Sequence, residues 1–114
     1  MSDCLFCAIV AGDIPADVVA RTDRVMAFRD IDPKAPTHIL IIPLEHFDNL
    51  TAVALADSAL AGELFEVAAK LAESEGIDQT GHRLVANTGR EGGQSVDHAH
   101  VHLLGGRSLG WPPG

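Results

Sequence analysis

Hydrophobic residues repeat with a helical spacing in one long segment of the chain. Across residues 57–76 they recur every three to four positions, which places them along one side of a helix. The repeating positions are Leu60, Leu64, Val67 and Leu71. Asp57 or Ser58 can cap the start of this helix, and Gly76 can end it. The pattern therefore predicts one long helix.

Short runs of apolar and β-branched residues between turn-forming residues predict five strands. The run His38–Ile42 is apolar after its first residue and lies between Pro36 and Pro43, which predicts a strand buried on both faces. The other four strands are expected at Val18–Arg21, Val25–Phe28, Arg83–Ala86 and His98–Leu104.

These strands, with one long and one short N-terminal helix, predict an α+β fold. Hairpin-length links between most of the strands favour a mainly antiparallel five-stranded sheet. A chain of 114 residues has the size of one domain, so residues 1–114 are expected to form a single unit.

Composition and charge narrow the range of functions. Hydrophobic residues make up 46% of the chain and charged residues 21%, which is the balance of a protein with a packed core. The net charge of −8 repels polyanions, so we expect no binding to nucleic acid and none to an anionic membrane. The first residues carry no basic region and no long apolar run, which favours a cytoplasmic protein.

Three histidines at every second position are the strongest chemical signal in the sequence. Side chains alternate across a strand, so His98, His100 and His102 are expected on one face, with the residues between them in the core. The spacing can also describe a strand with an ordinary polar face, or a three-histidine metal site. A metal is disfavoured because the three positions span roughly 13 Å along a strand.

A glycine-rich loop precedes the histidines. The loop Gly92–Ser95 can bring backbone N–H groups and a hydroxyl close to an anion. Joined directly to a histidine strand, it is interpreted as a phosphate-binding loop beside a nucleophile.

Taken together, these motifs resemble the Hint branch of the histidine triad (HIT) family. The histidines match its pattern His-φ-His-φ-His-φ-φ, where φ is an apolar residue. The resemblance covers nearly the whole chain. Its further matching segments are Phe28–Ile31, Ala35–His38, Asn87, Gly93–Ser95, Gly105–Arg107 and Trp111–Gly114.

The resemblance implies a homodimer with one continuous sheet. It also implies hydrolysis of purine nucleoside phosphoramidates through a nucleotidyl-histidine intermediate. Two alternatives are a dinucleoside polyphosphate hydrolase of the Fhit branch and a zinc-stabilised module that binds nucleotides without turning them over.

The resemblance further implies roles for individual residues. His100 is the expected nucleophile, and His102 and Ser95 are expected to contact phosphoryl oxygens, with His38 lining the same pocket. Asp30 is expected to bind the ribose. Gly93, Gln94 and Asn87 are expected to position the phosphate. The apolar residues expected around the base, each also explained by core packing, are Leu5, Phe6, Ile9, Phe28 and Ile31.

One position departs from the Hint pattern. Asp97 stands where proteins of that branch often carry an aromatic residue, so the rim beside the triad is more acidic here. The choice of leaving group is therefore left open by the sequence.

Two cysteines near the N-terminus have the spacing of zinc ligands. Cys4 and Cys7 can supply two thiolates, and His46 and His98 can complete a tetrahedral zinc shell. This assignment is similar to the Cys-Cys-His-His zinc of some bacterial HIT proteins, and it predicts one structural zinc per chain. The alternatives are two buried thiols or a redox pair, and a redox pair lacks the preceding strand of a thioredoxin-like motif.

Overall fold

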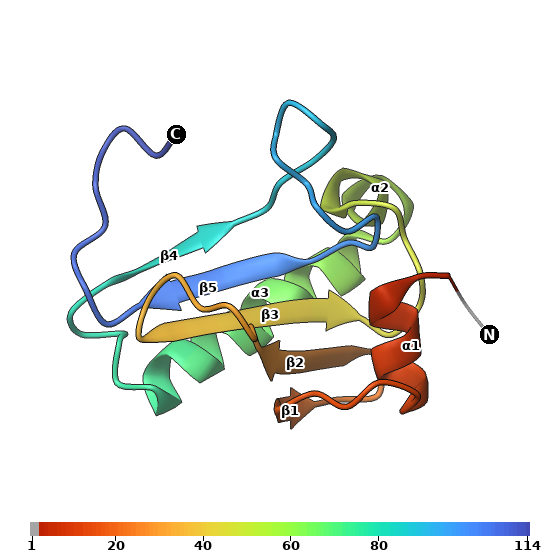
Figure 1. Ribbon diagram of the computed structural model, residues 1–114, viewed down its shortest axis with the longest axis horizontal. Helices are drawn as coiled ribbons and strands as arrows, with labels where there is room; N and C mark the ends of the chain where they lie inside the picture. The colour runs from red at the N-terminus through yellow and green to blue at the C-terminus, as the bar shows by residue number, and fades with distance from the viewer. Residues whose placement is uncertain (1–2) are drawn as a thin grey trace.

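A five-stranded antiparallel sheet with helices on both of its faces forms the core of the computed structural model, which describes residues 3–114 (Figure 1). The elements in chain order are α1 (Leu5–Ala11), β1 (Val18–Arg21), β2 (Val25–Arg29), β3 (Thr37–Pro43), α2 (Leu50–Ala56), α3 (Ser58–Ser74), β4 (His82–Val85) and β5 (Val101–Gly105). The predicted α+β fold with a five-stranded antiparallel sheet is confirmed.

The sheet places β3 at its centre. The strand order is β1-β2-β3-β5-β4, so β3 pairs with β2 on one side and with β5 on the other. Leu40 of β3 lies opposite Phe28 of β2 and opposite His102 of β5. His38 is two residues from Leu40 and therefore shares its face, diagonally next to His102.

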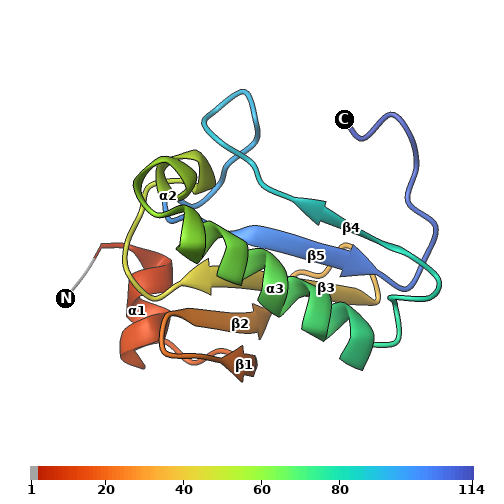
Figure 2. The ribbon, with the colours of Figure 1, turned by 180° about the vertical axis from the view of Figure 1, so that it is seen from behind.

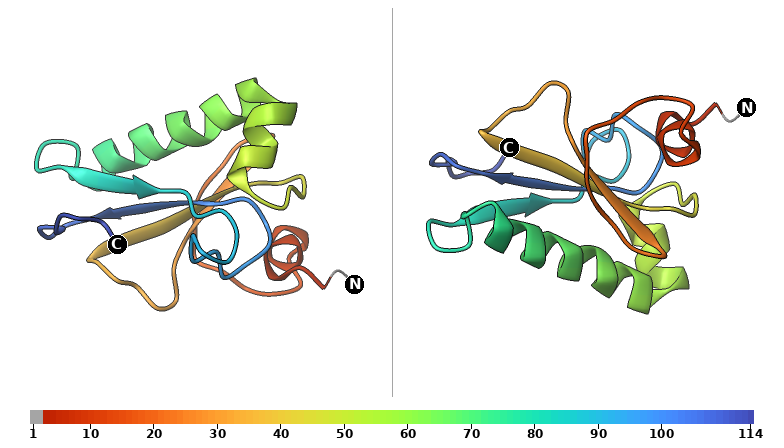
Figure 3. Two further views of the ribbon diagram at one scale, coloured as in Figure 1. Left: turned by 90° about the horizontal axis from the view of Figure 1, so that it is seen from above. Right: turned by 90° about the horizontal axis from the view of Figure 1, so that it is seen from below.

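The two faces of the sheet are covered by different helices. Helix α3 packs along one face (Figure 2), where the larger core includes Ile39, Ile41 and Leu64. Helix α1 lies against the opposite face (Figure 3), where Phe6 packs on Phe28 in the smaller core. The segment between β2 and β3 is also on this second side of the sheet.

Strand β3 contributes to both cores. All seven of its residues are buried, which confirms the strand predicted to be buried on both faces. Ile39 and Ile41 pack toward α3, whereas Leu40 and Ile42 pack toward α1. A strand with two buried faces has no polar alternation, which is why its sequence reads as a continuous apolar run.

The long helix has the predicted bounds and caps. Asp57 is the N-cap of α3, and its carboxylate accepts a hydrogen bond from Leu60 N–H at 3.1 Å. The helix ends at Ser74, and Gly76 follows with a φ of 75°. A residue just after a helix often has a left-handed backbone conformation, and glycine adopts it most easily because it has no Cβ. Within residues 3–114, every helix is too short or too polar to cross a membrane.

Helix α2 was not predicted from the sequence. Its N-cap Asn49 accepts a hydrogen bond from Ala52 N–H at 2.8 Å, and Leu50 and Val53 are its buried residues. Six of its seven residues are apolar, so its two turns show no alternation of apolar and polar positions that would indicate a helical period. Residues 3–114 therefore contain three helices instead of the expected two.

The last strand begins later than predicted. The expected strand His98–Leu104 is observed as Val101–Gly105, because Ala99 N–H donates to Phe47 O at 2.7 Å and leaves the ladder. The register would bring Ala99 opposite Pro43, and a proline has no N–H for a further sheet bond. Strand β4 is His82–Val85, one residue earlier than expected.

Candidate active site

A cavity of about 250 Å³ lies on the α1 side of the sheet. Ser95, His100 and His102 line it together with Asp30, so the structure brings these predicted site residues to one place. All five apolar residues expected around a base also line it: Leu5, Phe6, Ile9, Phe28 and Ile31. Ile31 is 98% exposed, so core packing does not account for it, whereas Phe6 and Phe28 belong to the smaller core as well.

The histidines alternate with core residues as predicted. The three residues between and after them, Ala99, Val101 and Leu103, belong to the core beneath α3. Phe6 contacts the rings of His98 and His100 edge-on, with ring centroids 5.8 and 5.2 Å apart. The ring of His102 lies next to that of His100, with 4.9 Å between the two ring centroids. The three imidazoles therefore form a continuous row on the α1 side.

The imidazole ring of His100 is held in one orientation by the backbone carbonyl of His98. Its Nδ1 lies 2.7 Å from His98 O, and a carbonyl can only accept, so Nδ1 carries the proton. In the neutral ring the other nitrogen, Nε2, then keeps its lone pair. His100 is 3% exposed and lines the cavity, so the ring is oriented as a nucleophile requires.

His102 takes its protonation pattern from a chain of hydrogen bonds. Lys34 N–H donates to His38 Nδ1 at 3.0 Å, so the proton of the neutral His38 ring is on Nε2. That Nε2 is 2.9 Å from His102 Nδ1, and it donates to it. The proton of neutral His102 is therefore on its own Nε2, which makes this nitrogen a hydrogen-bond donor.

Burial keeps these two rings neutral. Desolvation lowers the pKa of His38, although the carboxylate of Asp30 acts in the opposite direction. Desolvation, followed by repulsion from His100 and His38, lowers the pKa of His102 to about 4. Both imidazoles are therefore uncharged near pH 7, and the chain of hydrogen bonds is intact there.

The lowered pKa of His102 predicts how folding stability depends on pH. The unfolded chain binds a proton near pH 6.5, whereas the native ring binds it only near pH 4. The contribution of His102 is complete above pH 6.5 and is lost as the pH falls toward 4. We expect the free energy of unfolding, measured in urea at pH 7.0 and 5.0, to fall more in wild type than in His102→Gln. Equal losses would contradict this assignment, since the other titrating groups are common to both proteins.

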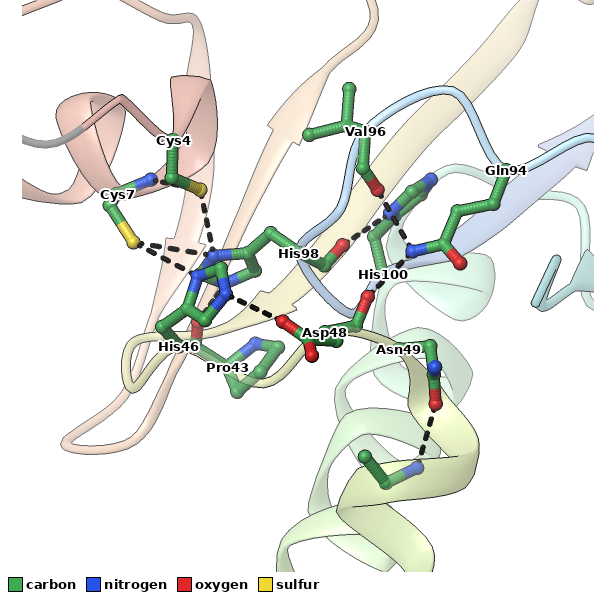
Figure 4. Close-up of polar contacts among 11 residues, drawn as sticks. Cys4, Cys7, Pro43, His46, Asp48, Asn49, Gln94, Val96, His98 and His100 are labelled. Atoms are coloured by element: carbon green, nitrogen blue, oxygen red, sulfur yellow. Dashed lines mark hydrogen bonds and ion pairs between the residues drawn. The ribbon is translucent and has the colours of Figure 1, made fainter. Parts of the chain in front are cut away.

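The predicted zinc ligands converge at the N-terminal end of α1 (Figure 4). The ligand atoms of Cys4, Cys7, His46 and His98 all lie within 4.8 Å of one another. His98 Nδ1 is 3.4 Å from Cys4 Sγ and 3.5 Å from Cys7 Sγ, and His46 Nδ1 is 3.4 Å from Cys7 Sγ. Tetrahedral zinc with bonds of about 2.0–2.3 Å separates its ligands by roughly these distances.

The hydrogen bonds made by the Nε2 atoms of His46 and His98 also fit a metal bound at Nδ1. His98 Nε2 donates to Pro43 O at 2.9 Å, and His46 Nε2 donates to Asp48 at 3.1 Å. Each ring therefore directs the lone pair of Nδ1 toward the sulfurs, which is the usual arrangement around a ligating histidine. The residues present fit a zinc ion.

A second group of potential ligands does not fit a metal. The ligand atoms of Asp30, His38 and His102 also lie within 4.8 Å of one another. However, His38 Nε2 carries its proton because Nδ1 accepts from Lys34, and a ligating nitrogen must offer a lone pair. This group is a hydrogen-bonded network.

The loop between β4 and β5 holds the remaining predicted residues. Asn87, Gly93 and Gln94 are on this loop but outside the lining of the cavity, as far as residues 3–114 are concerned. His38, expected to line the same pocket, is also outside that lining and reaches the site through its hydrogen bond with His102. The Gln94 amide donates to Asp48 O at 2.6 Å and to Val96 O at 2.9 Å, so both of its hydrogens are engaged (Figure 4). In this structure Gln94 fastens the loop to the segment after β3.

Asp97 lies beside the site in a separate hollow. It is exposed and lines this hollow of about 510 Å³ together with Asp3, Asp48 and Ser95. Ser95 and Val96 line both this hollow and the cavity. The acidic rim expected from the sequence is therefore next to the histidines.

Several groups that orient the site were not found from the sequence. They are the Lys34 N–H, the Pro43 carbonyl and the Asp48 carboxylate. Backbone groups carry no residue-specific signal. Only Asp48 could have been predicted from the sequence, because it lies two residues after His46, a predicted zinc ligand.

Known proteins are similar to this chain in sequence and in fold. The family profile described as HIT domain matches residues 11–109. The purine nucleoside phosphoramidase of Escherichia coli (strain K12) is 51% identical over 106 residues, covering 93% of this chain and 89% of that protein. The 14 kDa zinc-binding protein of Zea mays is 49% identical over 116 residues, covering 99% of this chain and 89% of that protein.

Solved structures agree with these sequence matches. A HIT family hydrolase from Legionella pneumophila Philadelphia 1 has a TM-score of 0.94 at 51% identity, covering 98% of this chain and 100% of that chain. A histidine triad protein from Clostridium difficile has a TM-score of 0.91 at 42% identity, covering 96% of each.

Proposed function

Since this chain belongs to the HIT family, we propose that it is a hydrolase that cleaves the P–N bond of purine nucleoside 5′-phosphoramidates. The observation that carries the proposal is the orientation of His100, whose Nδ1 donates to His98 O and whose Nε2 keeps a lone pair at the cavity. The 51% identity to the phosphoramidase of E. coli supports the substrate class.

The reaction proceeds in two displacements at the α-phosphorus. His100 Nε2 forms a bond to phosphorus while the P–N bond breaks, and the leaving nitrogen takes up a proton and departs as the amine. Water then attacks phosphorus, loses a proton, and returns the bonding electrons to His100. The nucleoside monophosphate is released. His102 donates from Nε2 to a phosphoryl oxygen, and the Ser95 hydroxyl is a second donor.

Other residues bind the nucleotide. The Asp30 carboxylate accepts from the ribose hydroxyls, since it has acceptor capacity only. Phe28 and Ile31 contact the base within the apolar part of the cavity. Asn87 and Gly93 position the phosphate, and Gln94 does so by holding the loop on which they lie.

We also propose that Cys4, Cys7, His46 and His98 hold one structural zinc per chain. The name of the Zea mays relative and the fit of the donor set support this assignment. When bound, the metal would cross-link α1 to the segment after β3 and to the segment before β5, and it would supply no catalytic chemistry. It has no place in the two displacements.

The assembly and location of the protein complete the proposal. We infer a homodimer in which two β4 strands, each at the edge of its sheet, join into one continuous sheet. The net charge of −8 supports a protein with no nucleic-acid or membrane partner. Thiolates used as metal ligands are typical of a reducing compartment, which supports a cytoplasmic location.

The test is a comparison of two substrates. A fluorogenic adenosine 5′-phosphoramidate and diadenosine tetraphosphate are incubated separately with the purified protein. We expect rapid release of the amine from the phosphoramidate and slow cleavage of the polyphosphate. Preference for the polyphosphate would instead assign the Fhit-like activity. Binding of both without turnover would assign a nucleotide-binding module.

The C-terminal tail provides a prediction about leaving groups. Trp111 is 83% exposed, and the tail is held beside β4 by the hydrogen bond from Arg83 Nη2 to Gly110 O at 2.7 Å. In the proposed dimer the indole is available to the partner's site. We expect a dimer in light scattering, and we expect removal of residues 111–114 to change selectivity between amine and anilide leaving groups more than stability. A monomer at micromolar concentration, or unchanged selectivity, would contradict this arrangement.

A further inference from the structure

The segment between β2 and β3, residues 30–36, carries two groups on which the proposed site depends. Asp30 lines the cavity, and Lys34 N–H fixes the proton of His38 on Nε2. The segment has no helix or strand of its own. Its position must therefore be held by contacts from other parts of the chain.

Arg107 supplies such a contact from beyond the end of β5. Its Nε donates to Lys34 O at 3.1 Å, and its Nη2 donates to the same oxygen at 2.9 Å. A third donor, Nη1, binds Ser108 O at 3.0 Å. Two parallel donors on one carbonyl fix the direction of the guanidinium as well as its distance.

The backbone from which the Arg107 side chain extends is also held in place. Gly106 has a φ of 89°, and a Cβ added there would lie 2.8 Å from Pro36 Cβ. The backbone before Arg107 is therefore in close contact with the end of the same segment. Arg107 and Gly106 hold the segment at Lys34 and at Pro36.

We propose that Arg107 is a positioning residue for the histidine pair of the active site. It holds the Lys34 carbonyl, the neighbouring Lys34 N–H then keeps the proton of His38 on Nε2, and His38 in turn keeps the proton of His102 on Nε2. Arg107 thereby determines which nitrogen of His102 carries the proton. The kinetic part of this inference rests on the proposed function, but the protonation pattern does not.

The same contacts predict what happens when Arg107 no longer holds the Lys34 carbonyl. With the segment released, Lys34 N–H no longer points at His38 Nδ1, and the neutral ring can carry its proton on either nitrogen. His102 then also divides between its two neutral forms. Only one of these forms can donate to substrate, so turnover falls without any change in the residues that contact the substrate.

The experiment reads the ring nitrogens directly. Long-range ¹H–¹⁵N spectra of histidine-labelled protein at pH 7.5 distinguish a protonated nitrogen from one with a lone pair, and His38→Gln and His102→Gln assign the signals. We expect wild type to show both rings protonated on Nε2. Arg107→Met is expected to shift both sets of signals toward an average of the two forms. It is also expected to lower kcat by roughly tenfold, as loss of an outer hydrogen-bond partner commonly does.

Two further variants separate positioning from folding. Arg107→Lys keeps one donor for Lys34 O and is expected to restore most of the wild-type spectrum. Arg83→Met removes a similar bond to the tail, at Gly110 O, and is expected to leave the nitrogen signals of His38 and His102 unchanged. Melting temperatures of all three variants serve as the folding control.

Wild-type nitrogen signals in Arg107→Met would overturn the proposal, even where activity falls. An equal shift in Arg83→Met would also overturn it, because the effect would then belong to the tail as a whole. Absence of phosphoramidase activity in wild type would instead overturn the proposed function, and the nitrogen spectra would still decide the role of Arg107.

Discussion

His100→Ala is expected to abolish turnover while the protein still folds and binds nucleotide. The substitution removes the atom that forms the bond to phosphorus, so no covalent intermediate can form. Loss of a nucleophile of this kind lowers kcat by roughly a thousandfold or more. The residues that contact base and ribose remain, so the affinity for adenosine 5′-monophosphate, measured by calorimetry, should change little.

The matched control is another histidine of the same chain. His82 lies in β4, where its ring contacts Ile77 O at 3.2 Å, outside the cavity. We expect His82→Ala to keep the wild-type rate. A His100→Ala protein with a tenth of wild-type activity would remove His100 from the role of nucleophile.

Replacing both cysteines with serine is expected to have the largest effect on stability. Zinc binding in a folded site contributes directly to the free energy of folding. In a domain of this size a loss of about 2 kcal/mol lowers the melting temperature by roughly 10 °C. The double variant Cys4→Ser, Cys7→Ser should contain no zinc by metal analysis, whereas wild type purified without chelator should contain close to one ion per chain.

Chelation of the wild-type protein distinguishes the metal from packing. A strong chelator should lower the melting temperature of wild type by a similar amount and leave the double variant unchanged. Serine is nearly the size of cysteine, so a packing effect alone would be small. Wild type that melts at the same temperature with and without metal would reassign the two cysteines to packing in the core.

Local patterns were sufficient to predict most of the elements. The helical period across residues 57–76 and the apolar run of β3 are properties of adjacent residues, and both elements were found with bounds close to those observed. Helix α2 is two turns long and apolar at nearly every position, so its sequence shows no helical period. The late start of β5 depends on Pro43, a residue on a different strand.

The candidate site was predictable in its residue types but not in its proton positions. The alternation of histidines predicted one row of rings, and the cysteine spacing predicted the group of zinc ligands. The orientation of each ring depends on backbone partners such as His98 O and Lys34 N–H. These groups are the same in every residue, so only the folded chain shows which of them meets which ring.

Gln94 illustrates the same limit in a side chain. Its place in the glycine-rich loop predicted a contact with phosphate, and that contact stays a prediction. The structure shows both amide hydrogens donated to backbone carbonyls, one of them at Asp48, beyond the end of β3. A long-range partner of this kind leaves no trace in the local sequence.

The central position of β3 also determines which parts of the site can open independently. His38 lies on a strand that both cores share, and the paired amides that follow it, from Ile39 to Ile41, should exchange with deuterium only when the whole sheet unfolds. Ser95 lies on a loop held by single hydrogen bonds, and its neighbours should exchange through local opening at much lower cost. The site thus combines the most slowly exchanging amides of the domain with some of its fastest. The loop can move for a substrate to enter while the histidine pair on the sheet stays in register.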